Sequence, residues 1–115
     1  MSTFLKQPIP PQTLYASVGR GFTIALRDKA RRRVRTLVEG TYVVRISDLS
    51  RHHSFHVVGE RGKFQPRSTV HGVFRGHAQR WQLKPGKYRF FCDAHQRRMH
   101  GEFRVIADPR GSYRP

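Results

Sequence analysis

Cysteine occurs once in this chain, as Cys92, and it opens a short segment rich in side chains that bind soft metal ions. His95 follows three residues later and Met99 four residues after that, so one segment carries a thiolate, an imidazole and a thioether. Thiolate and thioether sulfur favour copper over hard cations, and imidazole binds both Cu(I) and Cu(II). These residue types at this spacing predict a copper site.

A second imidazole is available upstream, in residues 52–56, which contain three histidines. Alternate side chains of a strand point to the same face. His53 then shares a face with the apolar Phe55 and Val57, whereas the other two histidines lie on the opposite face. Strand alternation therefore favours His53 as the buried ligand.

The same alternation places the thiol on an inward face. Residues 87–92 follow the turn pair Pro85-Gly86 and are rich in strand-forming residues. Tyr88, Phe90 and Cys92 share one face of this predicted strand. We therefore expect the sulfur at the apolar end of a strand, where a metal site is shielded from water.

The elements that position these residues are predicted to be strands throughout. A chain of 115 residues forms one domain and buries a core without disulfides. Short β-rich runs separated by glycine and proline are typical of an all-β sandwich or barrel. Strands are expected at residues 21–27, 34–38, 41–47, 69–74 and 79–83, with turns at 28–33 and 75–77. Residues 1–17 are expected to form an extended, Pro-rich N-terminal segment, 18–107 the domain and 108–115 a short C-terminal tail.

Several motifs resemble those of the plastocyanin/azurin-type cupredoxins, and in particular small bacterial copper-binding domains of that family. The likeness spans about residues 18–107. The motifs are Gly40-Thr41-Tyr42, Asp48-x-Ser50-x-x-His53-x-Phe55-His56, Leu83-x-Pro85-Gly86-x-Tyr88 and Cys92-Asp93-x-His95-x-x-x-Met99-x-Gly101-x-Phe103-x-Val105. The resemblance implies a cupredoxin-like Greek-key β-sandwich or barrel of about eight strands that holds one type 1 (blue) copper ion per chain.

The resemblance also implies a role for each ligand. At matching positions, His53, Cys92 and His95 are the equatorial ligands and Met99 is the weak axial ligand. His100 is the alternative axial ligand, because a shift of one residue in the loop would place it where Met99 is expected. Electron transfer is implied through the more exposed imidazole, that of His95.

Three further residues are expected around the ligands. Ser54 stands where the family usually has an asparagine whose side chain ties the ligand loops together. A serine is shorter but can still form hydrogen bonds, and such bonds orient metal ligands. We expect Ser54, Asp48 and Phe55 to support the ligands in this way.

The formal net charge of +16, contributed mostly by arginine, has more than one interpretation. A basic surface speeds encounter with acidic partners, and Arg51, Arg97 and Arg98 lie near the predicted ligands, where they would dock an acidic redox partner. The charge is equally explained as a solvated surface. Specific nucleic-acid binding is not expected, because the chain has no helical recognition pattern and no aromatic-basic signature of a nucleic-acid module.

The function predicted from these residues is the shuttling of one electron between redox partners. We expect no enzyme, because the chain shows neither an open coordination position nor a catalytic acid–base pair. The alternatives are a copper carrier or delivery protein, a zinc site formed by His53, Cys92, His95 and His100, and a metal-free binding module. A monomer is expected.

No run of 18 apolar residues predicts a membrane span, and no secretory signal peptide is visible in residues 1–13. The resemblance alone implies a periplasmic or extracellular location, and a cytoplasmic one stays open.

Overall fold

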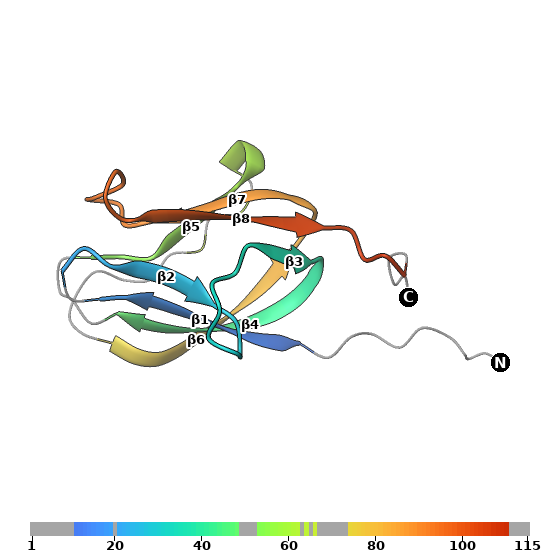
Figure 1. Cartoon of the computed structure of the whole chain (residues 1–115), viewed down its shortest axis with the longest axis horizontal. Helices are drawn as coiled ribbons and strands as arrows, with labels where there is room; N and C mark the ends of the chain where they lie inside the picture. Colours follow the sequence, from blue (N-terminus) through green and yellow to red (C-terminus); the bar gives the residue numbers. More distant parts are fainter. Residues whose placement is uncertain are drawn as a thin grey trace.

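The computed structural model describes residues 11–19, 21–48, 53–62, 64, 66 and 74–110. These residues form two four-stranded sheets that face each other (Figure 1). The first sheet has the order β2-β1-β4-β6, and the second has the order β3-β8-β7-β5. The eight strands are β1 (Gln12–Val18), β2 (Ile24–Arg27), β3 (Thr36–Val38), β4 (Gly40–Asp48), β5 (His56–Gly59), β6 (Phe74–Leu83), β7 (Gly86–Phe91) and β8 (His100–Ile106), and a 3-10 turn η1 (Glu60–Gly62) follows β5. The predicted all-β sandwich of about eight strands is confirmed.

The core lies between the two sheets and is built by alternation along the strands. In β4, Tyr42, Val44 and Ile46 are buried, because every second side chain of a strand faces the opposing sheet. At the centre, the Phe55 ring stacks on Phe90 with 5.3 Å between the ring centroids. Among the described residues, no helix has the length and hydrophobicity needed to span a membrane.

The first strand begins earlier than the sequence indicated. Residues 12–17, which were expected in the N-terminal segment, belong to β1, and β1 lies between β2 and β4 in the first sheet. The reason is the alternation of Leu14, Ala16 and Val18, all three of which are buried. The other domain limits stay predictions.

The predicted turn at residues 28–33 is present, but the hairpin ends at once. The Asp28 carboxylate accepts hydrogen bonds from the backbone N–H groups of Ala30 and Arg32, and a single bridge joins Arg27 to Arg33. The chain then crosses to the second sheet, where β3 pairs in parallel with β8. Burial of Val34 explains this crossing, since its side chain packs in the core between the sheets.

The prediction of two strands at 69–74 and 79–83 is wrong. A single strand, β6, runs through the expected turn at residues 75–77 and pairs antiparallel with β4. Gly76 is compatible with both a turn and a strand. The long partner strand decides between them, because it pairs with β6 on both sides of Gly76. The expected turn is replaced by an irregularity in the strand pair, where the register shifts between Ile46 and Asp48. Residues 69–73 lie outside the described part of the chain.

The hairpin of β7 and β8 carries the predicted ligand loop. Its pairing runs from Gly86 opposite Val105 to Phe91 opposite His100. Gly101 lies opposite Phe90, and a Cβ atom added at Gly101 would overlap the Phe90 ring. Glycine is therefore required here by a close packing contact.

Candidate metal centre

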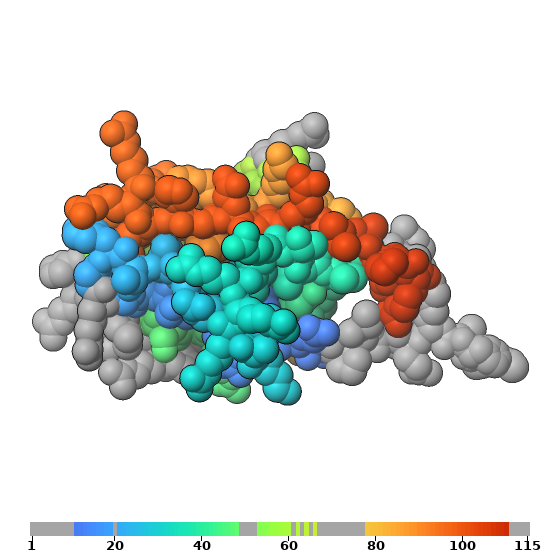
Figure 2. Space-filling view, viewed as in Figure 1, coloured from blue at the N-terminus to red at the C-terminus, as the bar shows by residue number. Residues whose placement is uncertain are grey.

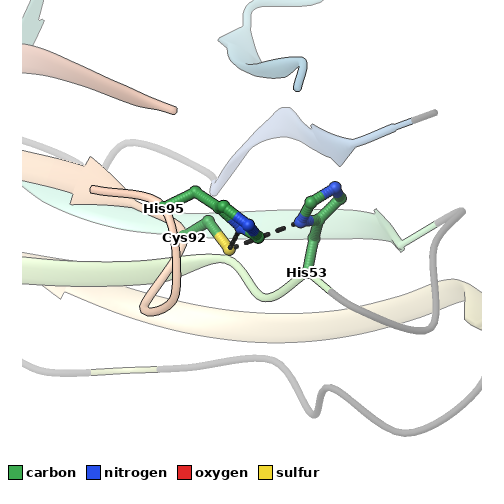
Figure 3. Close-up of side chains that lie close together, drawn as sticks. All are labelled: His53, Cys92 and His95. Carbon is green, nitrogen blue, oxygen red and sulfur yellow. Dashed lines mark hydrogen bonds between the residues drawn. The ribbon is translucent and has the colours of Figure 1, made fainter. Parts of the chain in front are cut away.

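His53, Cys92 and His95 come together in the structure, although His53 is far from the other two in the sequence (Figure 3). Their nearest ligand atoms all lie within 4.8 Å of one another. The Cys92 Sγ atom is 3.6 Å from Nδ1 of His53 and 3.7 Å from Nδ1 of His95. Both imidazole rings therefore direct the same type of nitrogen toward one sulfur atom.

These distances fit a single ion bound between the three side chains. Metal bonds of about 2.0 Å to nitrogen and about 2.3 Å to sulfur, at angles of about 110 to 120°, hold the two donor atoms about 3.5 to 3.7 Å apart. Both sulfur–nitrogen distances agree with that range. One thiolate with two imidazoles is also the His₂Cys donor set of trigonal copper sites.

Pairing between β5 and β7 explains why these residues meet. His56 at the start of β5 lies opposite Phe91 at the end of β7, so the residues just before β5 adjoin those just after β7. The loop between β7 and β8 is then closed by its own backbone. The Cys92 N–H donates to the Met99 carbonyl at 3.1 Å, and the Met99 N–H donates to the His95 carbonyl at 2.9 Å.

The His53 ring is oriented by the backbone of a distant segment. Its Nε2 atom lies 2.8 Å from the carbonyl oxygen of Gly21. A carbonyl only accepts hydrogen bonds, so the neutral ring carries its proton on Nε2 and turns the lone pair of Nδ1 toward Cys92. This is the outer hydrogen bond that typically fixes the tautomer of a metal-binding histidine.

Met99 and His100 face opposite ways. Met99 is 0% exposed and belongs to the core cluster that also contains Cys92. His100 begins β8, is exposed, and has its Nδ1 atom 2.9 Å from the Gln96 carbonyl oxygen. These positions favour Met99 over His100 as the axial ligand, and the ligand role itself stays a prediction.

Ser54 connects the two ligand segments through Asp93. Its hydroxyl donates to the Asp93 carboxylate at 2.8 Å and accepts from the Asp93 N–H at 3.2 Å. The other carboxylate oxygen of Asp93 lies 2.9 Å from Nδ1 of His56. Ser54 is 0% exposed. Its two hydrogen bonds join the segment of His53, which directly precedes it, to the segment of Cys92, which directly precedes Asp93.

Phe22 covers the outer side of the cluster. Its ring centroid lies 5.1 Å from that of His95 and 5.8 Å from that of His53. The Arg98 guanidinium lies over the Phe22 ring, 3.9 Å from its centroid. Phe22 is itself 44% exposed. Phe22 therefore contacts both imidazole rings and the Arg98 guanidinium, while part of its own ring stays open to solvent.

The remaining predicted residues lie in different places. Phe55 is buried in the core behind the cluster, and Asp48 is fully buried at the end of β4. Arg97 and Arg98 are exposed on the ligand loop, and Arg51 lies outside the described residues. The orienting role of Asp48 and the docking role of the arginines stay predictions. The sequence did not indicate that Gly21 and Phe22 contact the ligands. For Asp93, the only indication of a place at the site was its position directly after Cys92.

Of the comparisons with known proteins, the one with solved structures bears on the fold. No family model matches this sequence, and no curated protein matches it. The solved structures that resemble the chain include a reduced rusticyanin, with 15% identity over 82% of this chain and 78% of that one and a TM-score of 0.55. A second structure of rusticyanin, described as a copper protein, has 16% identity over 82% and 76% of the two chains and a TM-score of 0.55.

A third similar structure is auracyanin A, a blue copper protein from the photosynthetic bacterium Chloroflexus aurantiacus. It has 14% identity over 84% of this chain and 100% of that one, with a TM-score of 0.51. At such identities the likeness establishes the fold alone. The chain has the cupredoxin fold, and its cluster of His53, Cys92 and His95 fits a cupredoxin.

Proposed function

We propose that this protein binds one copper ion at a type 1 site and carries single electrons between redox partners. The observation that supports this proposal best is the convergence of one thiol and two imidazole nitrogens within 4.8 Å. Met99, fully buried on the same loop, supplies the weak fourth donor. Copper, when bound, supplies the chemistry by changing between Cu(I) and Cu(II).

The protein holds the metal-binding atoms in fixed positions and shields them from water. Cys92 is 1% exposed and His53 is 6% exposed, so water has little access to either. The Gly21 carbonyl fixes the His53 ring, and the backbone hydrogen bonds of the ligand loop hold the segment that carries the other three donors, Cys92, His95 and Met99. Donors held in this way need not move when the charge at the site changes, which favours fast electron transfer.

Electrons enter and leave on the His95 side. His95 is only partly buried, its imidazole packs against the exposed Phe22 ring, and the Arg98 guanidinium lies over that ring. The partner proposed for this side is an acidic redox protein, because cationic side chains of the ligand loop surround the exit. On the family resemblance alone, we place the protein in the periplasm or outside the cell.

The buried cluster also favours electron transfer over the alternative functions. Copper delivery requires release of the ion, and a site covered by Phe22 slows release. A four-ligand zinc site with His100 would need that side chain to leave the outer face and turn inward. Since all four proposed donors come from the protein, no position is kept for a substrate, and we propose a carrier and not an enzyme.

The first test is to add Cu(II) to metal-free protein and to record the visible absorption spectrum. One equivalent should produce an intense blue thiolate-to-copper band, because the Cys92 sulfur is positioned to bind the ion. Cys92→Ser is the control and should lose the band while keeping the folded state, as judged by circular dichroism. A colourless wild-type complex, or a band retained by the variant, would contradict the proposed site.

Copper delivery is tested on the same sample. For electron transfer, electron exchange between oxidised and reduced protein should be much faster than loss of copper to a chelator. Rapid loss with slow exchange would favour delivery instead.

A further inference from the structure

The outer face of the second sheet carries a shallow groove with a volume of about 790 Å³. β7 and β8, drawn in orange to red, form this upper side of the molecule in Figures 1 and 2. Four cationic side chains line the groove, together with two carboxylates. The cations are Arg35, Lys87, Arg89 and Arg104, and the carboxylates are Glu60 and Glu102.

Three of these cations form a row across the sheet. Lys87 of β7 lies directly opposite Arg104 of β8, and the Arg104 N–H donates to the backbone carbonyl of Arg35 at 2.9 Å. All three residues are exposed. Like charges directly opposite each other destabilise a strand pair. Within the described part of the chain, none of the three side chains forms a salt bridge.

Two other charged groups near the row, Arg89 and Glu60, have hydrogen-bond partners within the protein, and Glu102 lies opposite Arg89 in the strand pair. The Arg89 guanidinium donates to the Gln96 side chain at 3.3 Å and lies 4.9 Å above the Phe91 ring centroid. The Glu60 carboxylate accepts a hydrogen bond from the Lys87 backbone N–H at 2.7 Å. Arg35, Lys87 and Arg104, by contrast, have no salt-bridge partner among the described residues, so their charges are available to a bound anion.

The mixed lining indicates what kind of anion the groove accepts. A nucleic-acid backbone is negative throughout and would be repelled where Glu60 and Glu102 stand. A protein segment can alternate acidic side chains with neutral ones, and its neutral side chains can contact Val58 and Phe91, which also line the groove. Arginine and aromatic residues are also enriched at protein interfaces.

We propose that this groove, formed by Arg35, Glu60, Lys87, Glu102 and Arg104, docks an acidic segment of a partner protein. Carboxylates of that segment lie between Lys87 and Arg104 and remove the repulsion between them. The surface belongs to the sheet and not to the ligand loop, so the inference does not depend on copper.

The test is an NMR titration of the full ¹⁵N-labelled chain with a twelve-residue peptide that alternates glutamate and alanine, at physiological ionic strength. Amide signals of β7 and β8 should shift. In the double variant Lys87→Gln/Arg104→Gln, affinity should fall by about tenfold, because two charge-assisted contacts are lost. The matched control is Lys29→Gln/Arg33→Gln. It removes the same charge from exposed residues of the 28–33 turn, at the lower side of Figure 1, and should leave affinity nearly unchanged.

Three results would overturn the proposal. Equal loss of affinity in the two variants would show that the peptide senses only the net charge. Shifts confined to the Phe22 and Arg98 region would assign acidic binding to the metal end of the molecule. If a single-stranded DNA with the same number of charges binds in the groove more tightly than the peptide, the partner is a nucleic acid and not a protein.

Discussion

At the scale of single residues, neighbours in the sequence have opposite surroundings around the cluster. Met99 is enclosed in the core, while the next residue, His100, begins a strand on the outer face. Ser54 and His53 are both buried, yet one faces the Asp93 carboxylate and the other faces the Cys92 sulfur. Each of these contrasts leads to an experiment on one side chain.

Replacing Met99 by leucine should keep the blue band and raise the reduction potential. The band comes from the thiolate, whereas the thioether is a weak donor whose loss disfavours Cu(II) more than Cu(I). A redox titration followed by visible absorption measures both. His100→Ala should change neither quantity, because its imidazole points away from the cluster. A larger spectral change in His100→Ala than in Met99→Leu would mean that the axial assignment is wrong.

Replacing Ser54 by alanine should weaken copper binding by about 10- to 100-fold, as is typical when a group that orients metal ligands is removed. The change deletes both hydrogen bonds to Asp93 and leaves its carboxylate with one donor fewer. Competition with a chelator of known affinity gives the dissociation constant. Ser17→Ala is the control, because Ser17 alternates in β1 with the buried Ala16 and Val18 and takes part in none of the ligand contacts described above. Equal affinities for wild type and Ser54→Ala would contradict the linking role of Ser54.

The ligand candidates could be predicted from the sequence because they depend on local rules. Strand alternation indicates that His53 and Cys92 are buried, and both are, although both lie just outside β5 and β7 and the adjacent Ser54, expected on the opposite face, is buried as well. The contacts of Gly21 and Phe22 could not be predicted in that way. One is made by a carbonyl group that every residue has, and the other joins segments whose approach depends on how the whole sandwich packs.

At the scale of elements, strands marked by local sequence patterns were predicted correctly, and strands that depend on pairing with distant segments were not. The β7–loop–β8 hairpin was predictable because a turn pair and strong alternation mark it in the sequence. β6 was not, since Gly76 breaks the local pattern and the strand depends on pairing with distant β4. β3 was placed in a local hairpin, although its only described strand partner is β8.

The loop between β1 and β2 should control access to the cluster. In Phe22→Ala, we expect copper loss to a chelator to become several-fold faster, because the ring that shields His95 is removed. Stopped-flow absorption of the blue band measures the rate. Tyr15→Ala is a matched control, because Tyr15 is an aromatic residue with nearly the same exposure, 43% against 44%, but lies on β1. Unchanged rates in Phe22→Ala would exclude a shielding role for this ring.

At the scale of the whole molecule, part of the charge of +16 is gathered on particular surfaces. Arg97 and Arg98 are exposed on the ligand loop, and the cationic row of Arg35, Lys87 and Arg104, which has no salt-bridge partner among the described residues, lies on the outer sheet face. Composition could show the total charge but not this distribution, because it depends on which strands become neighbours. Long-range attraction depends on all charges, whereas docking depends on the few that face the partner.

Neutralising Arg97 and Arg98 as glutamine should slow electron transfer from hexacyanoferrate(II), an anionic donor, and should flatten the dependence of the rate on salt. Fewer cations near the exit lower the local concentration of the anion, and salt then has less attraction to screen. Stopped-flow kinetics at several ionic strengths give both quantities. Lys29→Gln/Arg33→Gln removes an equal charge elsewhere. If both double variants slow the reaction equally, the solvated-surface interpretation of the charge is correct.

The hydrogen bond from His53 to the Gly21 carbonyl has a consequence for mutational scanning. No side-chain substitution deletes a main-chain oxygen, so a scan of the whole chain would pass over this contact. Gly21 also has a φ angle of 67°, and a scan would record its sensitivity as a conformational requirement. Exchange of the amide between residues 21 and 22 for an ester, which weakens the oxygen as an acceptor, would separate the two roles. The orientation of the His53 ring therefore depends in part on the path of the backbone, which side-chain substitutions do not test directly.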